Sequence, residues 1–138
     1  MRYLLAILCL AGVIVSGLAL RVHYDTGTEP CSINEHWDCG IVNHSRYAMI
    51  GSIPVAALGI AGYLLLGILA FTRQRFLLLL FVGAAFCFAL RLTFIEEFAL
   101  EIWCLYCVIS QSIVALLLLS TGWFATEYVA LRRGRRAA

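Results

Sequence analysis

Four of the six cysteines are spaced as two pairs. Cys104 and Cys107 form a CxxC motif, and positions three apart on a helix share a face, so this pair can close into a disulfide. The partial positive charge at a helix N-terminus lowers the pKa of a thiol there, and Cys104 benefits most. Cys31 and Cys39 lie eight residues apart in a polar segment. Because a thiolate can attack a neighbouring disulfide, the two pairs predict a relay of thiol–disulfide exchange.

Spacing alone leaves two other uses of these cysteines open. The four could form two structural disulfides, or they could bind zinc, either by themselves or with His36 and His44. The eight-residue spacing is wide for a zinc knuckle, so we favour the relay.

The composition excludes an ordinary soluble globule and a disordered tail. Of 138 residues, 63% are hydrophobic and 13% are charged, with a mean hydropathy of +0.94. Soluble domains carry roughly 45–50% apolar and about 25% charged residues. The sequence therefore predicts a single-domain, all-α integral membrane protein.

Four apolar stretches are long enough to cross a membrane: residues 3–20, 53–71, 76–95 and 103–124. Residues 21–52 form the one extended polar segment, which we predict to be a redox loop between the first two spans. The first stretch could instead be a cleaved signal peptide, because it follows Arg2 and ends in Gly17-Leu18-Ala19.

Arginines predict the orientation, because cytoplasmic loops are enriched in positive charge. Both termini and the 72–75 turn are expected to be cytoplasmic, and the 21–52 and 96–102 loops to lie outside. The cytoplasmic set is Arg2, Arg73, Arg75, Arg132, Arg133, Arg135 and Arg136. The basic tail, residues 131–138, is then an anchor that attracts the anionic lipid of the bilayer, and no nucleic acid is expected as a partner.

This orientation places the two cysteine pairs at the outer surface, where compartments are oxidising. Cys9 and Cys87 fall within spans and are expected to be inert. Cys104 and Cys107 lie where a helix enters lipid, so a membrane quinone can reach them. The sequence carries no glycine-rich nucleotide loop. We expect a quinone of the ubiquinone, menaquinone or phylloquinone type as electron acceptor, with neither metal nor flavin.

The order of these motifs resembles the vitamin K epoxide reductase family, especially its short bacterial homologues without a fused thioredoxin-like domain. Cys31-x7-Cys39 is followed by Ser45, then by Gly51-Ser-Ile-Pro54 before an apolar span, then by Cys104-x-x-Cys107. The similarity covers about residues 3 to 125. It implies a bundle of four transmembrane helices that holds a quinone near its outer end.

The resemblance also implies a role for each cysteine. Cys107 would react with the quinone, and Cys104 would exchange with Cys39. Cys31 would exchange with a secreted thiol oxidase of thioredoxin fold.

Four further residues are candidate quinone contacts. Ser45 matches a Ser or Thr that the family keeps near its active site, and Tyr47 is placed to cap the pocket. Ser52 and Gln111 stand where human-type enzymes have an Asn and a Tyr. These departures put epoxide reduction in doubt rather than quinone use.

Other polar residues near the outer surface receive simpler interpretations. Glu96, Glu97 and Glu101 are expected to form a solvated acidic rim, and Arg91 is expected to extend outward from its span. His44 is a candidate proton carrier for the quinone step.

The sequence thus predicts a thiol–quinone oxidoreductase that supports disulfide formation, in a bacterial inner (plasma) membrane. One alternative is a reductase that recycles a quinone or vitamin K epoxide, located in the endoplasmic reticulum membrane if the source is eukaryotic. The other is a non-enzymatic membrane protein, stapled by disulfides or binding a metal.

Overall fold

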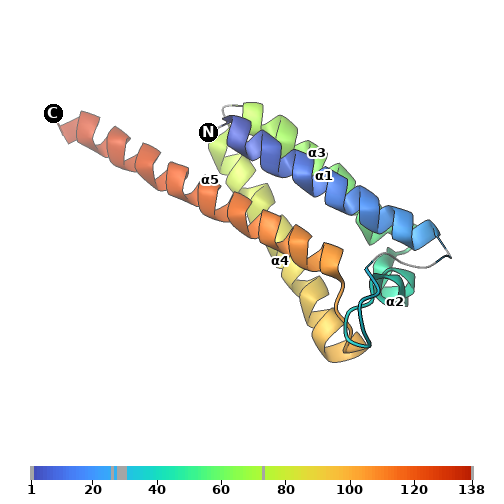
Figure 1. The fold of residues 1–138 in the computed structure, drawn as a ribbon. Helices are drawn as coiled ribbons and strands as arrows, with labels where there is room; N and C mark the ends of the chain where they lie inside the picture. Colours follow the sequence, from blue (N-terminus) through green and yellow to red (C-terminus); the bar gives the residue numbers. More distant parts are fainter. Residues whose placement is uncertain (1, 26, 28–30, 73, 138) are drawn as a thin grey trace.

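The computed structural model describes residues 2–25, 27, 31–72 and 74–137, with side chains up to residue 135. Long helices lie side by side along most of the molecule, and the last of them extends well beyond the others (Figure 1). These helices are α1 (Arg2–Tyr24), α3 (Val55–Phe71), α4 (Arg75–Ile95) and α5 (Leu105–Ala137). The shorter elements are α2 (Cys39–His44), η1 (Arg46–Ala48), β1 (Met49–Ile50), β2 (Ile53–Pro54) and η2 (Glu96–Leu100).

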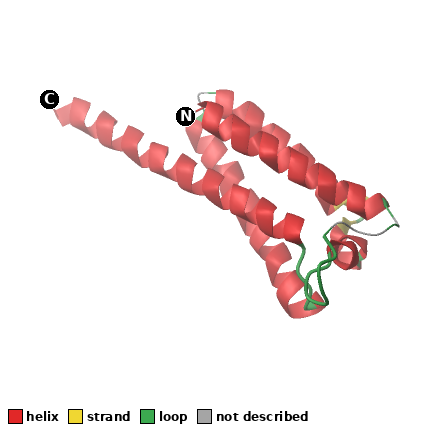
Figure 2. Ribbon diagram, in the orientation of Figure 1, coloured by secondary structure: helices red, strands yellow, loops and turns green. Residues whose placement is uncertain are grey.

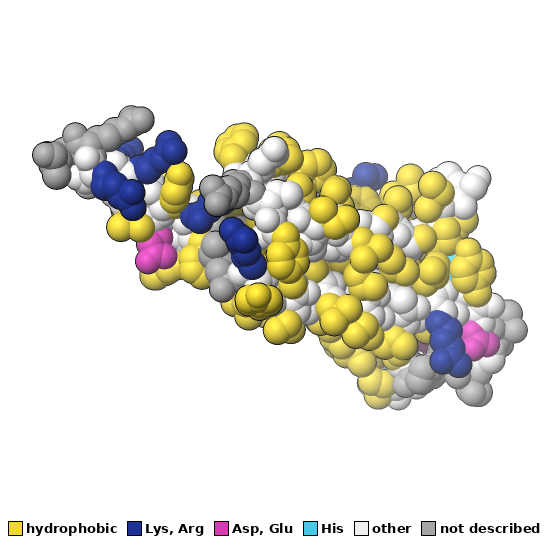
Figure 3. All heavy atoms as spheres, turned by 90° about the horizontal axis from the view of Figure 1, so that it is seen from above, with side chains coloured by type: hydrophobic (Ala, Val, Ile, Leu, Met, Phe, Trp, Pro, Cys, Tyr) yellow, Lys and Arg dark blue, Asp and Glu magenta, His cyan; other side chains and the backbone are white. Residues whose placement is uncertain are grey.

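Within the described ranges, 3 helices are long and apolar enough to cross a membrane: Arg2–Tyr24, Arg75–Leu100 and Leu105–Arg135. Large apolar side chains such as Ile7, Ile68 and Leu119 are exposed on the helices, and hydrophobic side chains cover the middle of the molecule (Figure 3). An all-α membrane protein is therefore confirmed. The second predicted span, 53–71, contains α3, whose 17 residues reach about 25 Å at ~1.5 Å per residue.

The centre of the bundle is a packed apolar core. Leu5, Val82 and Leu117 are buried there together with the aromatic ring of Tyr63. A Cβ atom at Gly12 would overlap that ring, so glycine lets α1 and α3 approach closely.

Much of the predicted 21–52 loop has regular structure. Helix α1 continues to Tyr24, four residues past the predicted end of the span, and α2, η1 and the β1–β2 hairpin follow (Figure 2). Gly51, with φ of 63°, supplies the left-handed conformation that the hairpin turn needs. These elements gather at the end of the bundle where α5 begins.

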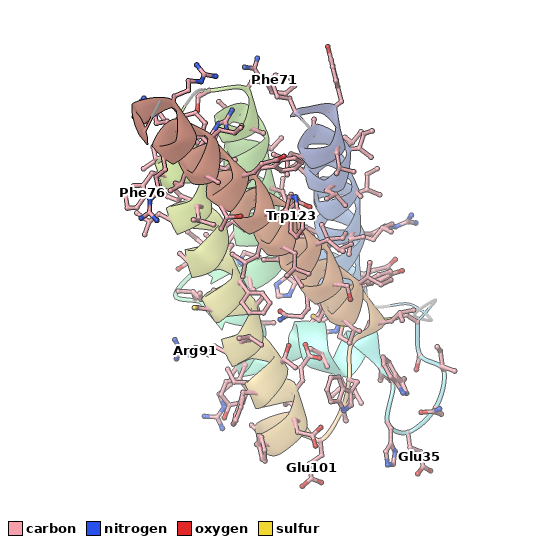
Figure 4. All side chains as sticks on the ribbon, turned by 90° about the vertical axis from the view of Figure 1, so that its left-hand side faces the viewer. Glu35, Phe71, Phe76, Arg91, Glu101 and Trp123 are labelled. Carbon is pink, nitrogen blue, oxygen red and sulfur yellow. A yellow bond between two sulfur atoms is a disulfide. The ribbon has the colours of Figure 1, made fainter. Side chains whose placement is uncertain are left out.

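Charges separate between the two ends of the bundle. Both termini lie at one end, and arginines gather near the C-terminus (Figures 1 and 3). Glu35 and Glu101 lie at the end opposite Phe71 and Phe76 (Figure 4). Arg73, predicted to be cytoplasmic, falls outside the described residues.

Candidate active site

Cys104 and Cys107 stand at the beginning of α5. Cys104 directly precedes the helix, and its carbonyl accepts a hydrogen bond from the Val108 N–H at 3.1 Å. Its own N–H donates to Oε2 of Glu96 at 3.2 Å. The side chain of Cys104 is 0% exposed, whereas Cys107, in the first turn of α5, is half-buried.

The two thiols of the CxxC motif affect each other. A hydrogen bond from the Cys107 side chain lowers the pKa of Cys104, while burial opposes this shift only in part. Cys104 is therefore the cysteine that this arrangement favours as a thiolate, because a hydrogen bond to the charged form stabilises it.

The polar segment docks directly against the chain that leads into the CxxC motif. The N–H of Trp103 donates to the carbonyl of His36 at 2.8 Å, and the N–H of Asp38 donates to the carbonyl of Trp103 at 3.1 Å. The rings of Trp37 and Trp103 pack at a centroid distance of 6.1 Å. These contacts bring Cys39, which follows Asp38, next to Cys104.

Helix α2 holds the second cysteine pair. The carboxylate of Asp38 caps α2 by accepting from the Ile41 N–H at 3.1 Å, and it accepts from the Ser32 hydroxyl at 2.8 Å. Slight desolvation raises the pKa of Asp38, but these hydrogen bonds outweigh it and hold the pKa below its usual value. Cys39 begins α2 and forms a disulfide with Cys31, and both side chains are buried.

Asn43 connects the two cysteine pairs, and sequence reasoning missed it. Its Nδ2 donates to the carbonyl of Cys39 at 2.8 Å and to Sγ of Cys104 at 3.6 Å, and the residue is 6% exposed. The one available signal was its position four residues after Cys39, which places both on one helix face. Nothing in the sequence indicated that this face would meet Cys104.

A cavity of about 430 Å³ lies beside the CxxC motif, between α1, α3, α4 and α5. This volume falls within the range of small-molecule sites. Its wall includes Cys107, Ser45, Tyr47 and Gln111. Ser52, the fourth predicted quinone contact, does not line it; Ser52 lies exposed in the β1–β2 turn.

The lining of the cavity combines polar and apolar side chains. Polar side chains such as those of Asn43 and Ser45 line the cavity together with Cys107, and among the described residues Oε1 of Gln111 is buried without a hydrogen-bond partner. Side chains of α3 and α4, among them Leu58, Phe81 and Phe88, form an apolar wall. An apolar molecule with a polar head fits this lining.

The prediction of a solvated acidic rim is wrong for Glu96. Glu96 is 3% exposed, lines the cavity together with Cys107, and accepts a hydrogen bond from the N–H of Cys104. The wide π-type turn of η2 carries its carboxylate inward, whereas Glu97 and Glu101 are exposed as predicted. The sequence alone did not indicate which of three neighbouring acids would turn inward.

The other candidates lie away from the cavity wall. His44 is exposed, with Nδ1 paired to the carbonyl of Gly40 at 2.8 Å. Arg91 is exposed and points away from the bundle (Figure 4). Cys9 is buried in the core, and Cys87 is exposed on α4. Throughout the described ranges, no group of three or more His, Cys, Asp or Glu side chains could hold a metal ion.

Apolar helices surround the cavity, Cys107 of the CxxC motif lies on its wall, and Cys104 is buried beside the Cys31–Cys39 disulfide. The chain belongs to the vitamin K epoxide reductase family, whose model matches residues 3–122. A search of curated proteins found no match. Family membership implies a membrane protein that links thiol oxidation or reduction to a quinone.

Proposed function

We propose that this protein oxidises thiols on the outer side of a membrane and passes their electrons to a quinone, so that it supports disulfide formation. The observation that carries the proposal is that the two cysteines of the CxxC motif have different surroundings. Cys107 lines the cavity, whereas Cys104 is buried with Cys39 and Cys31 on the other side. One cysteine therefore faces the electron donor and the other faces the acceptor.

The first step is exchange between a partner dithiol and the Cys31–Cys39 disulfide. A secreted protein of thioredoxin fold is the proposed partner; its two thiols become a disulfide, and Cys31 and Cys39 become thiols. Cys31 is 2% exposed. The segment that contains α2 must therefore open for the partner to reach this sulfur, which makes its motion part of turnover.

The second step moves electrons to the CxxC motif. The thiolate of Cys39 attacks the Cys104 sulfur of a Cys104–Cys107 disulfide, and Cys31 then resolves the Cys39–Cys104 disulfide. This step leaves Cys31–Cys39 oxidised and Cys104 and Cys107 reduced. The amide of Asn43, which donates to Sγ of Cys104, supports Cys104 as the sulfur that carries negative charge.

The third step reduces the quinone. The thiolate of Cys107 attacks the quinone ring to form a transient adduct, and Cys104 attacks Cys107 to release it. Two electrons and two protons move from the thiols to the quinone, which yields a quinol and a Cys104–Cys107 disulfide. Gln111 and Ser45, on the same cavity wall, are proposed to contact the quinone oxygens, and Tyr47 is proposed to close the pocket.

We further propose that α3 crosses the membrane as a fourth span. The hydrogen bonds between Trp103 and residues 36 and 38 require the polar segment and the start of α5 to lie on one side. The chain between them must then cross the membrane an even number of times, so α3 crosses if α4 does. With both termini cytoplasmic, the cysteine pairs face outward from a bacterial plasma membrane.

The test is quinone-dependent oxidation of a reduced thioredoxin-fold protein by the purified protein in lipid vesicles. We expect the wild type to consume one quinone for every two thiols oxidised, and Cys107→Ser to abolish quinone consumption. Cys87→Ser, at an exposed thiol on α4, is the matched control and should keep the wild-type rate. Full activity of Cys107→Ser would contradict the proposal.

A further inference from the structure

We propose that Glu96 is the catalytic acid–base of the quinone step, carrying protons from the two thiols of the CxxC motif to the quinone oxygens. This inference rests on the proposed function and adds a residue to it. Its observations are the burial of Glu96, its hydrogen bond with the N–H of Cys104 and its place on the cavity wall beside Cys107.

Glu96 contacts both halves of the CxxC motif. Oε2 accepts from the N–H of Cys104 at 3.2 Å, and Glu96 lines the cavity together with Cys107. The carboxyl group therefore lies at the CxxC motif, on the wall of the cavity that Cys107 lines.

Glu96 is almost completely removed from solvent. The residue is 3% exposed, and it lines the cavity together with Leu100 and Tyr106. Arg91, one turn and a half earlier on α4, is exposed and points away from the bundle (Figure 4). A buried carboxyl group requires compensating interactions, and polar groups of the CxxC motif supply those that the structure contains.

The chemistry of the other lining residues singles out Glu96. The polar side chains near Cys107 include the amides of Asn43 and Gln111 and the hydroxyl of Ser45. Amide and aliphatic hydroxyl groups do not release protons at neutral pH.

Among the described residues that line the cavity, the titratable ones besides Cys107 and Glu96 are Tyr47, Tyr63 and Tyr106. Phenols ionise near pH 10, and the Tyr63 hydroxyl is already bonded to Ser110 Oγ at 2.8 Å. Glu96 is thus the one carboxyl of the described lining, and a carboxyl can both accept and release a proton during turnover.

The proton path balances as follows. Cys107 gives its proton to the carboxylate of Glu96, and its sulfur bonds to a ring carbon of the quinone. Glu96 then gives that proton to the ring oxygen on which charge develops.

Cys104 next loses its proton to Glu96 and attacks the Cys107 sulfur. The carbon–sulfur bond breaks, its electron pair stays on the ring, and Glu96 delivers the second proton. The products are the Cys104–Cys107 disulfide and a quinol, and Glu96 ends as the carboxylate with which it began.

Glu96→Gln separates proton transfer from a structural role. The amide oxygen of glutamine can still accept from the N–H of Cys104, but glutamine cannot carry a proton. In a single-turnover experiment, reduced protein is mixed with a short-chain ubiquinone analogue and quinone absorbance is followed. We expect Glu96→Gln to slow this step about 10²-fold, the lower end of what a positioned acid–base contributes.

Glu97→Gln is the matched control, because Glu97 is the next residue of the same turn and is exposed. This variant should keep the wild-type rate. Exchange between dithiothreitol and the Cys31–Cys39 disulfide, which needs no quinone, should be unchanged in both variants and reports on folding.

A wild-type rate in Glu96→Gln would overturn the inference and assign Glu96 a structural role only. If Glu96→Gln fails to fold, the rates of quinone reduction are compared between Glu96→Asp and Glu96→Asn, whose side chains have the same length. A faster aspartate variant supports proton transfer by the carboxyl group, and equal rates overturn the inference. Failure of the wild type itself to reduce quinone would instead count against the proposed function.

Discussion

At the scale of single residues, the two CxxC cysteines differ in what surrounds them. Cys104 is fully buried and is contacted by Asn43, Glu96 and Cys107, whereas Cys107 lines the cavity. Cys104 is therefore suited to exchange with Cys39, and Cys107 to meet the quinone. The CxxC motif predicted a reactive pair. The spacing of the two cysteines does not by itself indicate which one lies toward Cys39 and which one lies toward the quinone.

The pH dependence of Cys104 is the first prediction. Because the Cys107 thiol lowers the pKa of Cys104, the thiolate persists to a lower pH than an unperturbed cysteine with a pKa of about 8.5. Exchange by Cys104 should therefore keep its rate as the pH falls from 8.5, until the pH reaches the lowered pKa. Thiolate absorbance measured against pH checks this: Cys107→Ala should move the Cys104 titration to higher pH, and an unmoved titration would contradict it.

Asn43 carries the second prediction. Asn43→Ala removes a donor from the Cys104 sulfur, and a hydrogen bond to a charged group contributes about 1.5–3 kcal/mol. Exchange between the loop pair and the CxxC pair should slow at least about tenfold, since each 1.4 kcal/mol is a factor of ten. Acid quenching and thiol alkylation would measure it. Ile41→Ala, at an exposed position on the same helix, should not change the rate.

At the scale of elements, the helices were largely predictable and the loop was not. Long apolar runs predicted the ranges that became α1, α4 and α5, because burial in lipid depends on length and composition alone. The structure inside residues 21–52 depends on specific contacts instead, such as the pairing of Trp103 with His36. These partners lie far apart in sequence, so no local pattern indicates them.

The contact between α1 and α3 gives the third prediction. A Cβ at Gly12 would overlap the Tyr63 ring, whereas a Cβ at Gly17, on the same helix, meets nothing within 4 Å. Gly12→Ala should lower the free energy of unfolding by about 1–3 kcal/mol, the usual cost of overpacking. Thermal unfolding in detergent would measure this loss. Equal stability of Gly12→Ala and Gly17→Ala would show that the two helices separate at little cost.

At the scale of the whole molecule, the composition has two consequences. The apolar excess places the chain in a membrane, and it also surrounds the CxxC pair with helices that form an apolar cavity of about 430 Å³. The six cysteines divide as predicted into two pairs at one end of the bundle and two cysteines within helices. The inward turn of Glu96 had no counterpart in the sequence pattern, because it depends on the backbone path of η2.

Membrane topology is the fourth prediction. In a variant without native cysteines, Glu35→Cys and Arg132→Cys should react with an impermeant thiol reagent from opposite sides of a sealed vesicle. The reason is that four crossings place the 21–52 segment and the C-terminal tail on different sides. Cysteines introduced at Glu35 and Glu101 should react from the same side. Labelling of residues 35 and 132 from one side would contradict the four-span arrangement.

Electron transfer from Cys39 to Cys104 is the central claim, and one disulfide-mapping measurement tests it most directly. The double variant Cys31→Ser/Cys107→Ser leaves Cys39 and Cys104 as the outer thiols, and its control Cys39→Ser/Cys107→Ser leaves Cys31 and Cys104. After mild oxidation in lipid vesicles, peptide mass spectrometry should find a Cys39–Cys104 disulfide in the first variant and no Cys31–Cys104 disulfide in the control. A Cys31–Cys104 disulfide without a Cys39–Cys104 disulfide would contradict the relay.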